Sequence, residues 1–265
     1  MAARYPERIV CLTEETTETL YLLGEERRIV GISGYTVRPP RARQEKPRIS
    51  SFLSARIDKI LELKPDLVLG FSDLQADIAR DLAKAGLNIM IFNQRSVDEI
   101  LSMILTLSSL VGATEKGAAL VSQLEGNLLQ IREKAKAFPR RPRVYFEEWD
   151  EPMISGIRWV SELVEIAGGE DVVSELSRSQ AASGRIHDGT QVIRRDPEVI
   201  LGSWCGKKFR PERVAARPGW ETVAAVKAHQ LFEVKSADIL QPGPAALTDG
   251  VRRIHSVLAG FVSSR

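Results

Sequence analysis

The sequence of 265 residues lacks the features that mark several classes of protein. Its only cysteines, Cys11 and Cys205, are too few for a disulfide framework, so nothing in the chain requires an oxidising compartment. No apolar run reaches the roughly 18 residues of a membrane-spanning helix. With 37 Lys and Arg against 35 Asp and Glu, the net charge of +2 lacks the basic excess of a nucleic-acid binder. We therefore expect a folded protein with no membrane span and no nucleic-acid partner.

Motifs of common catalytic and secretory classes are also missing. The chain has no Gly-rich phosphate loop, no GxSxG and no zinc-type spacing of Cys and His, so we predict neither a catalytic residue nor a metal site. The first residues, MAARYPERIVCL, lack the charged and apolar regions of a secretory signal. Together with the scarcity of cysteine, this favours a cytoplasmic location.

The dominant pattern is an alternation of short apolar runs with helical segments. Strands are predicted at residues 8–12, 28–33, 66–71, 88–92, 143–147, 198–202 and 231–234. Helices are predicted after Thr13 up to Gly24, and at residues 55–64, 74–85, 96–111, 114–138 and 244–261. Strands separated by helices of this length indicate βαβ units and mostly parallel sheets.

An internal repeat divides the chain into two similar parts. Residues 57–70 read IDKILELKPDLVLG and residues 189–202 read GTQVIRRDPEVILG, so Pro65 matches Pro197 at the point where a helix must end and a strand begins. The sequence therefore predicts an α/β fold of two similar lobes with mostly parallel sheets, joined by one long helix. We place the N-terminal lobe at residues 1–112, the linking helix at 113–140 and the C-terminal lobe at 141–265.

Several segments resemble one family over nearly the whole chain. These are RIVCLTEETTETLYLLG at 8–24, RIVGIS at 28–33, the repeat at 57–70, ISGIRWVSELVEIAGGEDV at 154–172 and RRDPEVILG at 194–202. They resemble the helical-backbone substrate-binding proteins of ABC importers for cobalamin, haem and iron siderophores, and the cobalamin-binding branch most of all. The resemblance implies a monomer, a periplasmic location, a ligand cleft between the lobes and an ABC permease as partner. The acidic residue that docks such proteins on the permease corresponds to Asp58 in the first lobe, whereas its second-lobe equivalent, Thr190, departs from the pattern.

Positions at the ends of predicted strands are the candidates for the cleft lining, because ligands of open α/β sheets bind outside the carboxyl ends of the strands. Three of the four tryptophans fall at such loop positions in the second lobe, and aromatic walls suit a flat, partly apolar ligand such as a corrin, porphyrin or nucleobase. The alternative is that these rings cover the core of the lobe. The predicted ligand-binding residues are Thr13, Glu14, Tyr35, Phe52, Phe71, Ser72, Trp149, Ser155, Arg158, Trp159, Trp204 and Cys205.

These observations favour non-catalytic binding of a corrinoid (cobalamin-like) or related tetrapyrrole or metal-chelate ligand by the binding component of an ABC uptake system. The alternative is a cytoplasmic enzyme or cofactor-handling protein with a site at Glu147–Glu151 and Cys205. The acidic run suits a cation or metal ion, although it is also typical of a solvated turn, and the positive charges of Lys207 and Lys208 would lower the pKa of the thiol. His187 is a candidate axial ligand to cobalt or iron. A modified nucleoside is a third ligand class that the same aromatic walls would accept.

Overall fold

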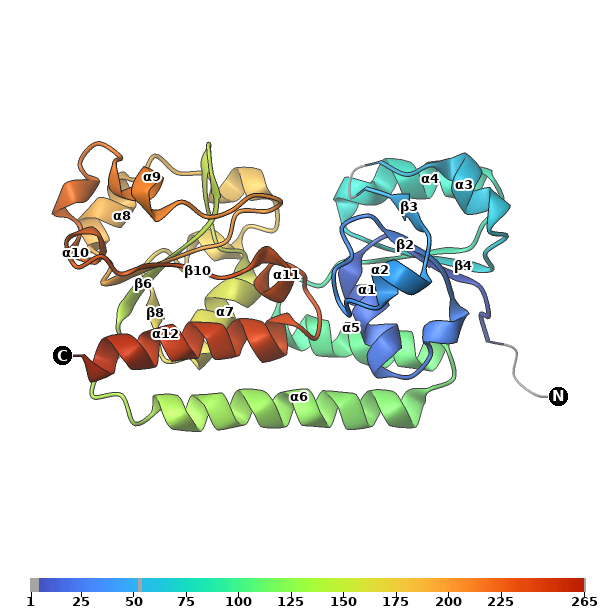
Figure 1. The fold of residues 1–265 in the computed structure, drawn as a ribbon, viewed down its shortest axis with the longest axis horizontal. Helices are drawn as coiled ribbons and strands as arrows, with labels where there is room; N and C mark the ends of the chain where they lie inside the picture. Colours follow the sequence, from blue (N-terminus) through green and yellow to red (C-terminus); the bar gives the residue numbers. More distant parts are fainter. Residues whose placement is uncertain (1–4, 52–53, 265) are drawn as a thin grey trace. The chain divides into compact units, whose positions relative to one another are not determined.

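The computed structural model describes residues 5–51 and 54–264, which form two compact units (Figure 1). Unit 1 comprises Met1–Gln94 and Asp98–Gln123, and unit 2 comprises Arg95–Val97 and Leu124–Arg265. Helix α6 (Thr114–Ala135) runs from unit 1 into unit 2 as one continuous helix. The prediction of two α/β lobes with mostly parallel sheets and one long helix is confirmed.

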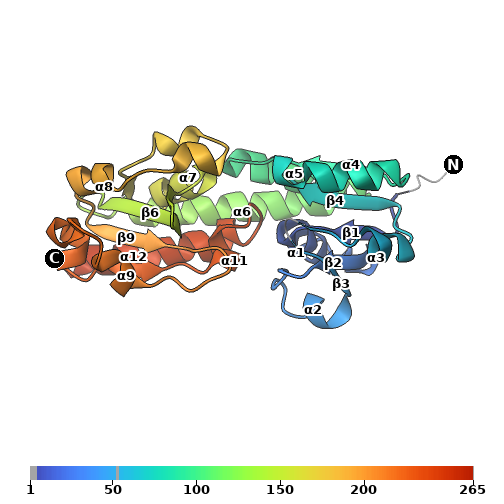
Figure 2. The same ribbon diagram turned by 90° about the horizontal axis from the view of Figure 1, so that it is seen from above.

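The sheet of unit 1 has the strand order β3-β2-β1-β4-β5, and every neighbouring pair is parallel. Figure 2 shows β4, β1, β2 and β3 side by side in that order. The strands are β1 (Ile9–Cys11), β2 (Ile29–Ser33), β3 (Arg48–Ser50), β4 (Leu67–Phe71) and β5 (Ile89–Phe92). The helices are α1 (Glu14–Leu22), α2 (Ala42–Glu45), α3 (Ile57–Glu62), α4 (Ala76–Lys84) and α5 (Val97–Leu110). The sequence pattern missed the short strand β3 and the helix α2 before it.

The sheet of unit 2 has the order β10-β9-β6-β7, with β8 also paired to β6. All of its pairs are parallel except β6 with β7, which form an antiparallel hairpin. The strands are β6 (Arg143–Asp150), β7 (Met153–Ser155), β8 (Glu170–Asp171), β9 (Val199–Gly202) and β10 (Leu231–Glu233). The helices are α7 (Arg158–Ile166), α8 (Thr190–Arg195), α9 (Pro211–Ala215), α10 (Ala224–Lys227), α11 (Ser236–Ile239) and α12 (Val251–Ser263).

The internal repeat folds in the same way in both units. Helix α3 precedes strand β4 in unit 1, and helix α8 precedes strand β9 in unit 2. The residue before each proline, Lys64 in one copy and Asp196 in the other, has a left-handed backbone with φ of 47°. Non-glycine residues seldom adopt this conformation, so the two copies share a specific and costly way of turning from helix to strand.

An arginine stabilises each of these turns. The Arg8 guanidinium donates through Nε to the Lys64 carbonyl at 3.1 Å, and that of Arg143 donates to the Asp196 carbonyl at 3.0 Å. In return, a carboxylate two residues after the left-handed position accepts the backbone N–H of the same arginine. Asp66 accepts from Arg8 at 3.0 Å, and Glu198 accepts from Arg143 at 3.1 Å. The duplication therefore extends to the hydrogen bonds that fix where each strand starts.

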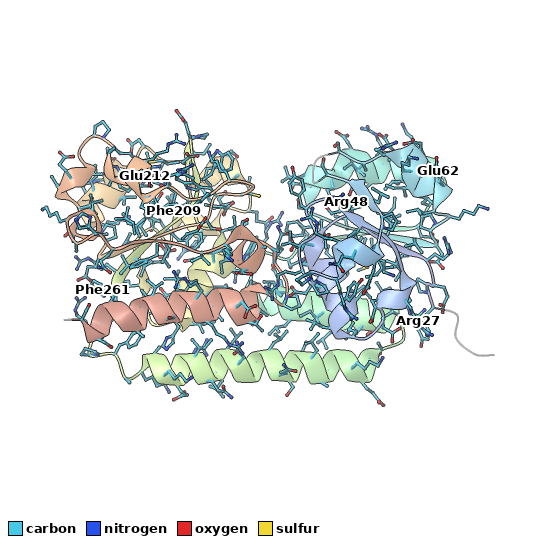
Figure 3. All side chains as sticks on the ribbon, in the orientation of Figure 1. Arg27, Arg48, Glu62, Phe209, Glu212 and Phe261 are labelled. Carbon is cyan, nitrogen blue, oxygen red and sulfur yellow. The ribbon has the colours of Figure 1, made fainter. Side chains whose placement is uncertain are left out.

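Each unit has its own apolar core around its sheet. In unit 1 the residues Val10, Ile60 and Val68 belong to one buried cluster. In unit 2 the cluster includes Tyr145 and Phe209, the second of which is labelled in Figure 3. In the part of the chain that the structure describes, no helix is both long enough and apolar enough to cross a membrane.

Candidate ligand-binding site

The carboxyl ends of the parallel strands of unit 1 lie on one edge of its sheet, and most of the predicted first-lobe residues follow those ends. Thr13 and Glu14 follow β1, Tyr35 follows β2, and Phe71 ends β4. The backbone N–H of Ser72 donates to the Phe92 carbonyl of the neighbouring strand β5 at 2.8 Å. The structure therefore brings these residues to the edge that ligands use in open α/β folds. Phe52 lies outside the described residues.

The first turn of α1 places buried carboxylates at this edge. Glu14 is 3% exposed and Glu15 is 1% exposed. The Thr13 hydroxyl donates to Glu15 Oε1 at 2.6 Å, while Glu15 Oε2 has no hydrogen-bond partner. Burial raises the pKa of each of the two glutamates to about 7. These carboxyl groups therefore exchange protons near neutral pH, where ordinary glutamates are fully ionised.

The acidic turn also holds the segment that follows β2. Glu14 Oε1 accepts the backbone N–H of Val37 at 3.1 Å, and Glu18 Oε1 accepts from Arg38 Nε at 2.9 Å. Within this segment Tyr35 is 57% exposed. An aromatic ring with so much free surface, on a segment fixed by hydrogen bonds, is the ring of unit 1 best placed for a ligand.

The other predicted residues of unit 1 are much less accessible. Thr13, Phe71 and Ser72 are 2%, 7% and 1% exposed. The Phe71 backbone N–H donates to Gln75 Oε1 at 2.9 Å, and Ser72 Oγ accepts from the backbone N–H of Leu74 at 3.2 Å. These residues therefore stabilise the structure of the edge, and their side chains have little surface with which to contact a ligand.

At the edge of unit 2 a buried ionic network surrounds Glu147, which is 0% exposed. Its two carboxylate oxygens accept from the Arg217 guanidinium at 2.5 and 2.9 Å. Trp204 Nε1 donates to Oε1 at 3.0 Å, and the Tyr145 hydroxyl donates to Oε2 at 3.1 Å. With this set of donors, the hydrogen-bonding capacity of the buried carboxylate is satisfied inside the protein.

The acidic run that follows is also paired, so it gives no support to the alternative of a site for a cation or metal ion. Glu148 accepts from Arg185 at 2.6 and 3.1 Å, and Asp150 forms ion pairs with Lys207 and, at 3.2 Å, with Arg213. Within residues 5–51 and 54–264, no group of three or more His, Cys, Asp or Glu side chains is arranged to hold a metal ion. The interpretation as a solvated turn fits only Glu151, whose side chain is 86% exposed, whereas Asp150 is only 7% exposed.

The three loop tryptophans are not equivalent. Trp159 is 3% exposed, and its Nε1 donates to the Ile239 carbonyl at 2.9 Å. Trp204 is 2% exposed and packs edge-on against Phe209, with ring centroids 5.0 Å apart. For these two, the alternative that the rings cover the core of the unit describes the structure, because almost none of their surface can reach a ligand.

Trp149 differs from the other two because it is only partly buried, near the end of β6. Its Nε1 donates to the Glu151 carbonyl at 2.9 Å, and Lys207 Nζ lies 4.0 Å from the ring centroid. Trp149 is therefore the predicted tryptophan with ring surface left at the edge of unit 2.

The remaining candidates of unit 2 are separated by their exposure. Ser155 is 1% exposed and its hydroxyl lies 3.4 Å from the Arg185 carbonyl, whereas Arg158 is exposed and pairs with Glu162 at 2.9 Å. Cys205 is exposed. His187 has both ring nitrogens engaged: Nδ1 accepts from the backbone N–H of Gly189 at 3.1 Å, and Nε2 lies 3.0 Å from the Tyr145 hydroxyl. Burial lowers the pKa of His187, and these contacts leave it no nitrogen with which to ligate cobalt or iron.

The arginines that pair with the acidic run could not be predicted from the sequence. Arg185 is 2% exposed and lies 37 residues from Glu148, while Arg217 lies 70 residues from Glu147. No local spacing connects such pairs, so the charge pattern alone could not reveal them. Asp58, the predicted docking residue, has a side chain that is 68% exposed and lies 3.8 Å from Arg56.

Each unit thus has a sheet of mostly parallel strands with candidate ligand-binding residues at the carboxyl ends of its strands. A comparison of the chain with known families agrees with this arrangement. The family model described as "Periplasmic binding protein" matches residues 9–237. The chain belongs to the periplasmic binding protein family. The resemblance inferred from the repeated segments is thereby confirmed.

Individual relatives of this periplasmic binding protein carry different descriptions, and two of those below name a ligand. An uncharacterized ABC transporter substrate-binding lipoprotein, YvrC, from Bacillus subtilis is 25% identical over 94% of this chain and 79% of its own length. A vitamin B12-binding protein from Pectobacterium atrosepticum is 26% identical over 74% of this chain and 71% of its own length. The structure of the periplasmic heme-binding protein RhuT from Roseiflexus sp. RS-1 matches with a TM-score of 0.80 and 22% identity, covering 95% of this chain and 99% of that one, which supports the fold.

These relatives correct the predicted location. A lipoprotein of an ABC transporter and periplasmic proteins act outside the cytoplasm, and the family carries the same description. The preference for a cytoplasmic location is therefore wrong. It gave too much weight to the scarcity of cysteine, which does not distinguish a protein that folds without disulfides from one kept in a reducing compartment.

Proposed function

We propose that this periplasmic binding protein holds a corrinoid, cobalamin-like ligand without chemical change and presents it to an ABC permease. The observation that carries the proposal is an aromatic ring at the ligand edge of each unit: Tyr35 after β2, which is 57% exposed, and Trp149 near the end of β6, which is partly buried. Broad, partly apolar ligands gain most of their binding energy from such rings. A relative described as a vitamin B12-binding protein supports the same ligand class.

The paired carboxylates of unit 2 support binding without catalysis. An enzyme built on the acidic run would need a carboxylate able to take or give a proton, or a nucleophile beside a base. Glu147, Glu148 and Asp150 are instead each in an ion pair with an arginine or lysine. Such pairs fix the shape of the edge and occupy these carboxylates with protein partners.

Calorimetric titration with cobalamin tests the proposal, after native mass spectrometry has shown whether a ligand copurifies with the protein. We expect saturable one-to-one binding with a dissociation constant in the micromolar range or below. Tyr35→Ala and Trp149→Ala should each weaken binding by about tenfold, the effect of losing one stacked ring. No binding at high micromolar concentration would overturn the corrinoid assignment.

Two variants serve as matched controls. Tyr5 is also exposed but precedes β1, at the opposite edge of the same sheet, so Tyr5→Ala should leave affinity unchanged. Trp149→Phe keeps an aromatic ring in place and should retain most of the affinity. If Tyr5→Ala weakened binding as much as Tyr35→Ala, the ligand edge would not be the determinant.

Haem is a second candidate, favoured by the exposed phenol of Tyr35, because tyrosine oxygen is a known axial ligand of haem iron. The structure-matched relative described as heme-binding supports it. Tyr35→Phe separates the two ligands, since it keeps the ring and removes the oxygen. Loss of haem affinity in this variant would favour haem, whereas cobalamin binding that is unchanged in Tyr35→Phe and weakened in Tyr35→Ala would favour the corrinoid.

Docking on a permease through Asp58 forms part of the proposal, supported by the exposure of its side chain. Asp58→Lys should reduce ligand uptake by cells while the purified protein binds as well as the unchanged protein. Unchanged uptake would remove Asp58 from the docking surface.

A further inference from the structure

The segment at residues 34–38, directly after β2, carries the exposed ring of Tyr35 and is anchored by its own backbone. Thr36, the next residue, is 0% exposed. The backbone N–H of Tyr35 donates to Ser33 Oγ at 3.3 Å, and that of Thr36 donates to the Ser33 carbonyl at 3.1 Å. These two bonds form a local turn, but they do not connect the segment to a helix.

Glu14 connects the second half of this segment to α1. Its Oε1 accepts the backbone N–H of Val37 at 3.1 Å, and the backbone of Arg38 is also hydrogen-bonded to this carboxyl group. The Arg38 side chain is held by the same helix, with Nε donating to Glu18 Oε1 at 2.9 Å. Residues 39–40 are both proline, which has no backbone N–H. The two N–H groups at Glu14 are therefore the last backbone donors available to fix the segment.

Glu14 itself has almost no surface with which to contact a ligand, because it is 3% exposed. Burial raises the pKa of Glu14 to about 7, although the hydrogen bonds from the backbone of Val37 and Arg38 act to lower it. A carboxyl group keeps an oxygen that can accept from N–H groups whether it is protonated or ionised. Glu14 can therefore hold the segment on both sides of neutral pH.

We propose that Glu14 is a positioning residue, which fixes the segment that carries Tyr35 and affects ligand binding through that ring rather than by touching the ligand. The inference rests on the proposed function, because it takes Tyr35 as a ligand contact. A contact ring contributes most when hydrogen bonds from a supporting side chain already hold it in place, since less freedom is then lost on binding.

A double-mutant cycle tests whether Glu14 acts through Tyr35. Calorimetric titrations with cobalamin and with haem compare the unchanged protein, Glu14→Ala, Tyr35→Ala and the double variant. Glu14→Ala should weaken binding about fivefold when Tyr35 is present, but by less than about twofold in the Tyr35→Ala protein. Equal losses in the two backgrounds would mean that Glu14 acts on the ligand independently of the ring, and would overturn the inference.

Amide hydrogen exchange followed by NMR measures the hold on the segment without any ligand. In Glu14→Ala the Val37 amide should exchange about fivefold faster than in the unchanged protein, as expected for the loss of one hydrogen bond. The Val68 amide, which donates to the Asn88 carbonyl at 2.9 Å, reports on opening of the sheet and should change much less. An unaltered exchange rate at Val37 would also overturn the inference.

Two further variants show which property of the side chain matters. Glu14→Gln keeps a carbonyl oxygen, so it should restore most of the ligand affinity and most of the protection of the Val37 amide. Glu26→Ala is the matched control. Glu26 Oε1 lies 3.0 Å from the guanidinium of Arg41, further along the same connection, and the Arg41 side chain is 55% exposed. Loss of such an exposed pair should change neither the affinity nor the exchange at Val37. Failure of Glu14→Gln to restore protection would contradict the role given to the acceptor oxygen.

The outcomes separate this inference from the proposed function. If neither cobalamin nor haem binds, the proposed function fails, and exchange at Val37 alone supports or overturns the hold of Glu14 on the segment. If a ligand binds but the cycle shows no coupling between Glu14 and Tyr35, the proposed function stands and the positioning role is wrong.

Discussion

Substitution of the buried Glu15 tests how unit 1 responds to pH. Glu15 is 1% exposed, accepts one hydrogen bond from the Thr13 hydroxyl and has a second oxygen without a partner. Burial raises the pKa of Glu15 to about 7 from an ordinary value of 4.5. Glu15→Gln replaces this carboxyl with a group of almost the same shape that stays neutral at every pH.

The direction and size of the effect follow from proton linkage. Because the pKa is raised in the folded state, the folded protein binds the Glu15 proton more tightly than the unfolded chain does. The resulting stabilisation is complete below about pH 4.5 and is lost as the pH rises through about 7. A shift of this size corresponds to about 3 kcal/mol of unfolding free energy between the two limits. Glu14 behaves in the same way and remains in the variant, so the pH dependence should fall by about half.

Urea unfolding followed by far-UV circular dichroism, at about pH 5, 7 and 9, measures this dependence. The amide of Gln has one polar group without a partner, which lowers the unfolding free energy. Because this loss is the same at every pH, it does not affect the slope of unfolding free energy against pH. Glu62→Gln is the control, since its side chain is 64% exposed (Figure 3) and should not alter the slope. An equal slope in the unchanged protein and in Glu15→Gln would refute the reasoning that Glu15 titrates near neutral pH.

Two further predictions concern the core of unit 2 and the backbone. Glu147→Gln leaves the Arg217 charge without its partner, so thermal unfolding should show a loss of about 3–5 kcal/mol in unfolding free energy; a loss under 1 kcal/mol would mean that water reaches the pair. Gly202→Ala places a methyl group 1.9 Å from a Phe209 ring carbon and should cost about 1–3 kcal/mol, measured by urea unfolding. Gly126→Ala, in α6 with no atom within 4 Å of the new methyl group, should instead stabilise the protein by about 0.5–1 kcal/mol, and the same sign in both variants would contradict the packing argument.

The order of the elements could be predicted because local patterns encode it. Apolar runs and helical periods marked the main strands, and the two prolines marked the same boundary in both units. Short elements such as β3 and β7, with three residues each, were missed because so few residues show no period. The left-handed conformation of Lys64 and Asp196 could not be predicted either, because neither residue type by itself indicates a positive φ.

The candidate site was predicted by position but not by orientation. Tyr35 follows a strand as predicted, but Trp149, predicted in a loop, lies within β6. Trp159, also predicted in a loop, lies in the first turn of α7 with its indole donating to the Ile239 carbonyl. A sequence shows where a loop falls but not which way a side chain points. The ion pairs of the acidic run could not be predicted either, because their partners, such as Arg217, are distant in the sequence.

The uneven distribution of tryptophan has a consequence for spectroscopy. All four tryptophans, at positions 149, 159, 204 and 220, belong to unit 2, and the residues assigned to unit 1 include none. Intrinsic emission excited at the red edge therefore reports on the surroundings of unit 2 residues alone, and a ligand that does not absorb in the emission band and contacts only unit 1 would leave the local environment of every tryptophan unchanged. A tryptophan introduced by Tyr35→Trp would give the silent half an optical probe of its own.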